Sequence, residues 1–244
     1  MFMMFASDLD NTLIYSYKNA KDGDVCVETK DGRRLSFMPP KSRTLLREIS
    51  GNVLFVPVTT RSLEQYSRLD LGVKPRYALA ANGAVLIMGG KVCESWTDET
   101  HRLLNAKPPC INENAFLYDI RCVDGFFVCA KSDAPAQAVN HLKDVVCEKH
   151  FVVKAVQNKV YIMPKGLDKG TALRRLLKRL GVEKAICAGD GILDIPMLEA
   201  ADIAVFPKTL GLDLENSHVL DADAFVHEAL NVVKKLAEQP QGFS

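Results

Sequence analysis

The sequence predicts an α/β fold: a doubly wound, Rossmann-like parallel sheet with an α+β unit inserted in its middle. At both ends of the chain, short apolar runs alternate with segments of helical spacing, a pattern typical of a parallel sheet covered by helices. The middle of the chain instead has strands joined by tight turns. A chain of 244 residues is long enough for a large core and a smaller module.

The first part of the core is expected over residues 1–88. It opens with an apolar run that predicts a central strand buried on both faces. Ser62 and Gln65 later form a capping-box pattern at a helix start. In chain order we expect a strand over 1–7, a hairpin over 25–37, a helix over 41–49 closed by Gly51, a strand over 53–58, a helix after Ser62, and strands over 77–81 and 84–88 around an Asn82-Gly83 turn.

The inserted cap is expected over residues 89–165, and the core resumes over 166–244. Gly89-Gly90 and Pro164-Lys165-Gly166 are the expected hinges. The cap should contain strands over 115–123 and 126–131, a helix over 134–149 and a hairpin turning at Gln157-Asn158. The second core part should contain a helix over 169–180, a strand over 184–188, a helix through Met197-Leu198, a strand over 203–206 and a closing helix over 222–238.

Composition excludes several classes of protein. With 31 basic and 30 acidic residues, the formal net charge is +1, so we expect no nucleic-acid partner and no binding to an anionic membrane surface. Seven scattered cysteines without a Cys-x-x-Cys pair predict neither a disulfide framework nor a zinc ribbon. The apolar residues 1–6 are too few for a membrane span or a signal sequence, and we expect a cytoplasmic protein.

Acidic and hydroxyl side chains stand where three parallel strands should end. In an open parallel sheet, the ligand site lies beyond the carboxyl ends of the strands, so these groups should meet at one edge. Each group alone is a weak signal, since such residues also cap helices and form turns. The three strand ends are Asp8-x-Asp10-x-Thr12, Thr59-Thr60-Arg61 and Gly189-Asp190-x-x-x-Asp194.

These groups suit phosphoryl transfer. Asp8, as an ordinary ionised carboxylate, could attack phosphorus, and Asp10 could protonate the leaving group and later deprotonate water. A phosphate ester would be repelled by so many carboxylates, so the site needs a divalent cation and a positive side chain. Mg²⁺ suits Asp8, the Asp10 backbone carbonyl and Asp190. Lys169, at a predicted helix start, could supply the other charge, and Thr59 with the amides after it could hold phosphoryl oxygens.

In order and spacing, Asp8-Leu9-Asp10-Asn11-Thr12, Thr59-Thr60-Arg61, Lys169-Gly170 and Gly189-Asp190-Gly191-Ile192-Leu193-Asp194 resemble the four motifs of the haloacid dehalogenase (HAD) superfamily. The insertion between the second and third motifs resembles the type C2 cap of Cof-type sugar phosphatases, sucrose-phosphate phosphatases and phosphomannomutases. The resemblance implies a Mg²⁺-dependent phosphatase acting on a small phosphorylated metabolite, a sugar phosphate above all.

The resemblance also implies roles for individual residues. Asp8 would be the nucleophile and Asp10 the acid/base, and Thr59, Thr60 and Lys169 would bind phosphate. Asp8, Asp10 and Asp190 would hold the metal. The supporting residues would be Asp194, Arg61 and Asn82, of which Arg61 could equally pair with a carboxylate to hold its loop.

The chain departs from the family pattern at three positions. Asn11 stands where Gly is common, and Asn also accepts left-handed backbone geometry. Thr60 replaces a common Gly in the second motif, and Leu193 replaces a common Asn before the last Asp. None of these changes removes a reacting group.

Two alternatives stay open. A phosphomutase would share the aspartyl phosphate, but it must grip two phosphates, and only Arg102 and Arg121 are available between residues 91 and 163 as bidentate groups. A non-catalytic binding or regulatory protein would keep the fold without turnover, for which Leu193 is the one supporting feature. The aromatic residues Trp96, Tyr118, Phe126 and Phe127, expected in the cap, could stack on a sugar or form the cap's own core.

Overall fold

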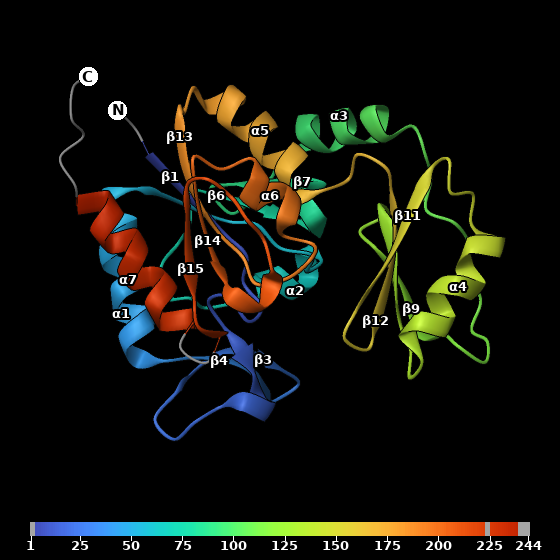
Figure 1. Ribbon diagram of the computed structural model, residues 1–244, viewed down its shortest axis with the longest axis horizontal. Helices are drawn as coiled ribbons and strands as arrows, with labels where there is room; N and C mark the ends of the chain where they lie inside the picture. The colour runs from blue at the N-terminus through green and yellow to red at the C-terminus, as the bar shows by residue number, and fades with distance from the viewer. Residues whose placement is uncertain (1–2, 223–224, 239–244) are drawn as a thin grey trace.

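The computed structural model describes residues 3–222 and 225–238. Its centre is a parallel sheet in the order β15-β14-β13-β1-β5 (Figure 1). β1 lies between β13 and β5, with Phe5 opposite Ile186 and Phe55 in the two registers. The strands are β1 (Met3–Ser7), β5 (Leu54–Pro57), β13 (Lys184–Ala188), β14 (Ile203–Pro207) and β15 (Ser217–Leu220).

Helices cover both faces of this sheet, as a doubly wound fold requires (Figure 1). On one face, α1 (Pro40–Asn52) and α7 (Phe225–Glu238) pack through Leu46, Ile49 and Leu230. On the other face, α5 (Lys169–Leu180) and α6 (Ile195–Glu199) pack through Leu173 and Met197. Burial of both sheet faces explains why the strands read as continuous apolar runs.

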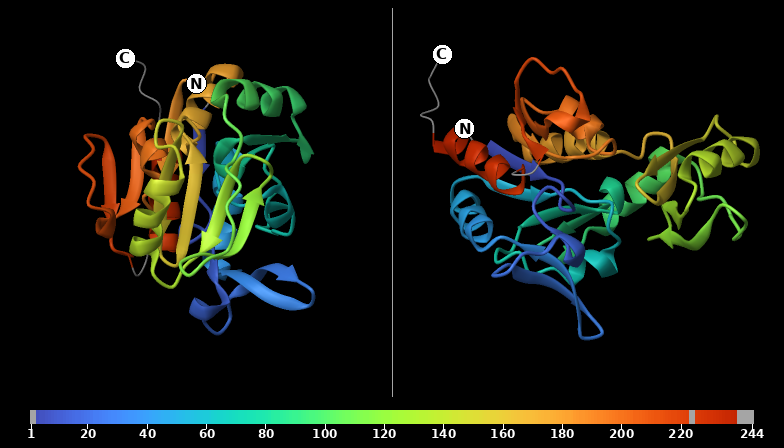
Figure 2. Two further views of the ribbon diagram at one scale, coloured as in Figure 1. Left: turned by 90° about the vertical axis from the view of Figure 1, so that its right-hand side faces the viewer. Right: turned by 60° about the horizontal axis from the view of Figure 1, so that its bottom comes forward.

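Two antiparallel units extend the core. A hairpin, called the hairpin arm from here on, projects from the core (Figure 2). It consists of β3 (Val25–Lys30) and β4 (Arg33–Met38), and the short β2 (Tyr15–Ser16) pairs with β4. A second sheet contains β6 (Tyr77–Ala80), β7 (Val85–Met88) and β8 (Lys91–Val92). It meets the parallel sheet at a single parallel bridge between Val58 and Leu79. The short helix α2 (Leu63–Ser67) carries the expected capping box between Ser62 and Gln65.

The middle of the chain forms a separate layer beside the core (Figures 1 and 2). Its antiparallel sheet has the order β11-β12-β10-β9, and α4 (Pro135–Val145) covers the face away from the core. The strands are β9 (Tyr118–Val123), β10 (Phe127–Lys131), β11 (Phe151–Val156) and β12 (Lys159–Pro164). This sheet with α4 is called the cap from here on.

The expected elements differ from the structure in a few places. Gly51 lies inside α1, which continues to Asn52. The helix α3 (Glu94–Leu104) was not expected, and its Trp96 packs with the core cluster of Met4 and Leu173, so Trp96 is not a cap residue. The strand β15 was also missed. The predicted start of the closing helix falls partly on residues 223–224, which lie outside the described residues.

Within residues 3–222 and 225–238, no helix combines the length and apolar character needed to cross a membrane.

Candidate active site

The ends of β1 and β13 bring the first and last acidic motifs together. β1 ends at Ser7, and the Asp8 amide donates a 2.9 Å hydrogen bond to the carbonyl of Ala188, the last residue of β13. The Thr12 hydroxyl then donates to the Asp190 carboxylate at 2.9 Å. Asn11, with φ at 62°, makes the left-handed turn that carries the chain from Asp10 to Thr12. The predicted convergence of these strand ends is confirmed.

Lys169 joins the two acidic motifs. Its Nζ donates to Asp8 Oδ1 and to Asp194 Oδ1, each at 2.5 Å, and the side chain is 1 % exposed. The next residue, Gly170, lets α5 approach α6 closely, because a Cβ at that position would lie 1.9 Å from the Pro196 carbonyl oxygen. The small residue therefore fixes the depth at which Lys169 enters the site.

The cluster holds more negative than positive charge. Three carboxylates, from Asp8, Asp190 and Asp194, surround one ammonium group. Burial raises the pKa of Asp8 well above its ordinary value, and Lys169 only partly offsets this. Burial and the nearby Asp194 likewise raise the pKa of Asp190 to about 6. Burial would lower the pKa of Lys169, but Asp194 and Asp8 raise it, so the ammonium stays charged. The expectation that Asp8 is an ordinary ionised carboxylate is therefore wrong for the metal-free site.

The same charge imbalance suits a divalent cation. Asp8, Asp190 and Asp194 each offer an oxygen atom, and these atoms lie within 4.8 Å of one another. Hard carboxylate oxygens are the ligands that Mg²⁺ prefers, and its charge would favour the ionised forms of Asp8 and Asp190. Asp194 also accepts hydrogen bonds from the amides of Asp190 and Gly191, at 3.1 and 2.9 Å, which orders the last motif. The supporting role of Asp194 stays a prediction.

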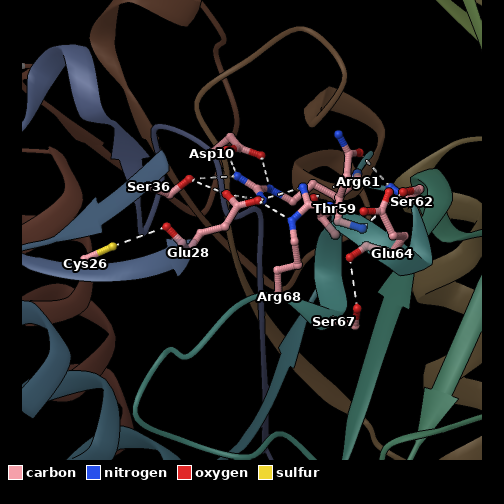
Figure 3. A network of polar contacts seen from close by, with 11 residues as sticks. Asp10, Cys26, Glu28, Ser36, Thr59, Arg61, Ser62, Glu64, Ser67 and Arg68 are labelled. Carbon is pink, nitrogen blue, oxygen red and sulfur yellow. Dashed lines mark hydrogen bonds and ion pairs between the residues drawn. The ribbon is translucent and has the colours of Figure 1, made fainter. Parts of the chain in front are cut away.

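The Asp10 side chain points toward Arg61 (Figure 3). The Arg61 Nε and one terminal nitrogen donate to the two Asp10 oxygens at 2.8 and 2.7 Å, a bidentate pair. Although burial opposes it, Arg61 lowers the pKa of Asp10 and holds the carboxylate ionised. Of the two roles weighed for Arg61, pairing with a carboxylate is the one the structure has.

Arg61 is itself anchored by the hairpin arm. Its other terminal nitrogen donates to Glu28 at 2.8 Å, and Glu28 also accepts from Arg68 at 2.8 Å and from the Ser36 hydroxyl at 2.6 Å (Figure 3). The Glu28 side chain is 3 % exposed, so this carboxylate is buried and fully paired. Arg61 thus connects β3 to the second motif and to Asp10, and Arg68 connects β3 to the end of α2.

The remaining predicted residues surround this centre. Thr59 is buried, and its hydroxyl accepts from the Arg61 amide at 3.2 Å, while Thr60 lines a cavity beside the cap. Asn82 donates to the Leu167 carbonyl at 3.1 Å, so it holds the segment that leads into Lys169. Leu193 packs in an apolar cluster that contains residues of both core and cap, including Phe126. The Leu193 side chain therefore makes apolar contacts at a position where the family pattern has a polar side chain.

A cavity of about 870 Å³ lies next to Asp10, between the cap on one side and the hairpin arm and α2 on the other. Asp10, Thr60 and Arg61 line it from the core. From the cap it is lined by Arg121, Val123, Phe127, Cys129, Lys131, Lys159 and Tyr161 among others. Tyr161 packs with Phe127 and also lines the cavity.

Two sets of residues at this site were not predicted from the sequence. Glu28, Ser36 and Arg68 carry no motif, and only the folded hairpin brings them to Arg61. The basic cap residues could have been found from strand alternation, because Lys131 and Lys159 are register partners on neighbouring strands. Their common face would then have followed from the two-residue period of a strand.

The sequence matches one family model and two phosphatases among known proteins. A family model described as haloacid dehalogenase-like hydrolase matches residues 92–206. A phosphoglycolate phosphatase of Methanothrix thermoacetophila is 30% identical over 184 residues, which cover 71% of this chain and 76% of that protein. Phosphoglycolate phosphatase 2 of Saccharolobus solfataricus is 26% identical over 170 residues, which cover 66% of each.

Solved structures share the fold at lower identity. The sucrose-phosphatase of a Synechocystis species, solved with sucrose and phosphate, matches with a TM-score of 0.63 at 18% identity, covering 96% of this chain and 99% of that one. A haloalkanoate-superfamily phosphatase of Bacteroides thetaiotaomicron matches with a TM-score of 0.65 at 16% identity and 96% coverage of both chains. At such identities, these matches support the α/β fold with its additional antiparallel sheets.

Proposed function

Because this chain belongs to the haloacid dehalogenase-like hydrolases and is a phosphatase of that family, we propose that it hydrolyses a small phosphate monoester through an aspartyl phosphate on Asp8, with Mg²⁺ as cofactor. The observation that carries the proposal is the buried Asp8–Lys169–Asp194 cluster at the strand ends, with Asp190 beside it. A sugar phosphate or another phosphorylated metabolite of similar size is the expected substrate class.

In the first step, an oxygen of Asp8 attacks phosphorus and the bond to the leaving oxygen breaks, with Asp10 supplying the proton to that oxygen. In the second step, water attacks phosphorus, Asp10 takes its proton, and the bond between phosphorus and Asp8 breaks to release phosphate. Lys169 keeps the nucleophile aligned and offsets charge on the phosphoryl group, while Thr59 and the amides beside it would bind phosphoryl oxygens.

Asp8, Asp190 and the Asp10 backbone carbonyl would hold Mg²⁺, with Asp194 ordering the loop. When bound, the ion would polarise the phosphoryl oxygens and balance the negative charge of the cluster. The excess of carboxylates over lysine and the raised pKa values of Asp8 and Asp190 support this assignment, because both describe a site short of positive charge.

Phosphate release from a panel of phosphate esters, including sugar phosphates and 2-phosphoglycolate, tests the proposal with and without Mg²⁺. We expect Mg²⁺-dependent release that Asp8→Asn lowers by at least about 10³-fold, since the nucleophile is lost. Asp22→Asn, at an exposed position of the same residue type, is the matched control and should keep full activity.

Product analysis separates the phosphatase from a phosphomutase, since the first yields free phosphate and the second an isomeric phosphate ester. A folded wild-type protein that releases no phosphate from any ester, or one whose release survives Asp8→Asn, would contradict the proposal. Mg²⁺ should also raise the melting temperature of the wild type and of Asp22→Asn, a readout of binding that is independent of turnover.

A further inference from the structure

The cap sheet turns a basic face toward the cavity. In the pairing of β10 with β12, Cys129 lies opposite Tyr161 and Lys131 lies opposite Lys159. The residues between them, such as Ala130 and Val160, pack under α4 in the cap's apolar cluster. Because successive side chains of a strand point to opposite faces, Lys131 and Lys159 belong to the face that lines the cavity. Arg121 joins them as the register partner of Cys129.

Charge is not balanced in this cavity. Six basic and four acidic side chains line it, which are Lys30, Arg61, Arg68, Arg121, Lys131 and Lys159 against Asp10, Glu28, Glu64 and Asp124. On the core side, Arg61 and Arg68 already neutralise Asp10 and Glu28. The surplus positive charge therefore lies on the cap side.

Three cap cations line the cavity, and they differ in their ion pairs. Asp119 pairs with Lys131 at 2.7 Å and contacts Arg121 at 3.5 Å. Lys159 forms no ion pair with any side chain that the structure describes. Lys159 and Asp10 line the same cavity, from the cap and from the core.

The position of this charge bears on the part of the substrate that is released. A phosphoryl group seated against Asp8 and Thr59 would direct the leaving group past Asp10 and Thr60 into the cavity, whose far wall is the basic face of the cap. With a neutral leaving group, the exposed Lys159 would donate only to water or neutral oxygens, whereas an anionic leaving group would accept charge-assisted hydrogen bonds from it.

We propose that the leaving group of the substrate carries a second anionic group, a carboxylate or a phosphate, which Lys159 binds with help from Arg121. This inference rests on the proposed phosphatase function and narrows its substrate class. Lys159 and Arg121 are then specificity-determining residues: they select the substrate and take no part in the transfer of the phosphoryl group.

Matched substrates test this inference. 3-Phosphoglycerate and glycerol 3-phosphate differ by a carboxylate in place of a hydroxymethyl group, and fructose 1,6-bisphosphate and fructose 6-phosphate differ by one phosphate. We expect kcat/KM to favour the more anionic member of at least one pair by about 10- to 150-fold, the range expected for a charge-assisted hydrogen bond. The pair that shows the preference identifies which anion is recognised.

Variants at cap residues test whether the cap causes the preference for the more anionic substrate. Lys159→Met should reduce the ratio of kcat/KM between the two members about tenfold, mainly by raising KM for the anionic one, and Arg121→Gln should reduce it less. Lys154→Met is the matched control, because Lys154 lies on the same sheet opposite Tyr161 but does not line the cavity. It should leave the ratio unchanged.

The outcomes separate this inference from the function on which it rests. No release from any ester, p-nitrophenyl phosphate included, would overturn the phosphatase proposal and this one with it. Release without a preference for the anionic member of either pair would overturn only the inference. A preference that survives both Lys159→Met and Arg121→Gln, or a Lys159→Met variant that slows both members equally, would also overturn it.

Discussion

Replacing Glu28 with Gln tests whether the hairpin arm holds the second motif in place. The Glu28 carboxylate is 3 % exposed and accepts hydrogen bonds from Ser36, Arg61 and Arg68. Glu28→Gln keeps the shape of the side chain but puts an amide NH₂ where one oxygen accepted from a guanidinium. The variant therefore removes the charge and turns one attractive contact into a contact between two donors.

The structure sets the size of the expected effect. A hydrogen bond to a charged group contributes about 1.5–3 kcal/mol, and removing one partner of a buried ion pair costs about 3–5 kcal/mol. Arg61 keeps Asp10 and Arg68 keeps Glu64, so the loss should lie at the low end, about 3 kcal/mol. For a chain of this length, that corresponds to a melting temperature lower by about 6–12 °C.

Thermal unfolding as a function of pH checks the origin of this loss. Burial alone would raise the pKa of Glu28, but Ser36, Arg61 and Arg68 lower it below its ordinary value of 4.5. A carboxyl group whose pKa is lowered in the folded state stabilises the protein above its unfolded pKa, and this contribution is lost as pH falls through the folded pKa. The difference between wild type and Glu28→Gln should therefore be full at pH 7 and shrink below pH 4.5.

Glu64→Gln is the matched control. Glu64 pairs with the same Arg68 but is 69% exposed, so its removal should cost less than about 1 kcal/mol. A Glu28→Gln variant that melts within about 2 °C of the wild type would refute the anchoring role. So would a difference that stays constant as pH falls from 7 to below 4.5.

Three further predictions concern the buried cluster. Asp8→Asn should melt at or above the wild-type temperature at pH 7 without Mg²⁺, because burial disfavours the Asp8 charge; calorimetry that finds it much less stable would contradict this. The pKa of Asp190 is raised from 3.8 to about 6, so ionisation of Asp190 destabilises the metal-free folded state. This loss of stability is complete above about pH 6 and disappears as pH falls toward 3.8. The stability advantage of Asp190→Asn should therefore be larger at pH 7 than at pH 5, and an advantage independent of pH would be the opposing result. Gly170→Ala should lower the melting temperature and the activity together, because its Cβ would meet the Pro196 carbonyl, whereas Gly51→Ala, in open space and without a positive φ, should lower neither.

The elements that could be predicted are those whose buried residues form a short apolar run or a regular apolar spacing in the sequence. β1 and β13 are buried on both faces, and α5 presents a clear apolar stripe with Asp168 as its cap. The elements that were missed lack such patterns. α3 buries only Trp96 and Thr100 and has no side-chain cap, and β15 is a short, half-exposed edge strand. Their positions depend on neighbours that are distant in sequence.

The same distinction explains which site residues could be predicted. Asp8 and Asp190 stand at the ends of adjacent parallel strands, so the topology alone brings them together. Glu28 lies on a hairpin, and its contact with Arg61 depends on how that hairpin folds back over the second motif. No spacing in the sequence encodes how the hairpin packs against the second motif. The sequence did allow Arg61 to be considered as a partner for a carboxylate.

The Arg61 pair imposes a particular division of labour on Asp10. A carboxylate held ionised by a bidentate arginine is ready to take a proton from water, which is the second step of the proposed reaction. The first step needs Asp10 protonated, and the Arg61 contact disfavours that form. A leaving group that is already a good anion, such as p-nitrophenolate, needs no proton, so its release should be less sensitive to Asp10→Asn than that of an alkyl phosphate. If both substrates lose activity equally, Asp10 contributes mainly to the second step or to the position of Arg61, and its role as a general acid is refuted.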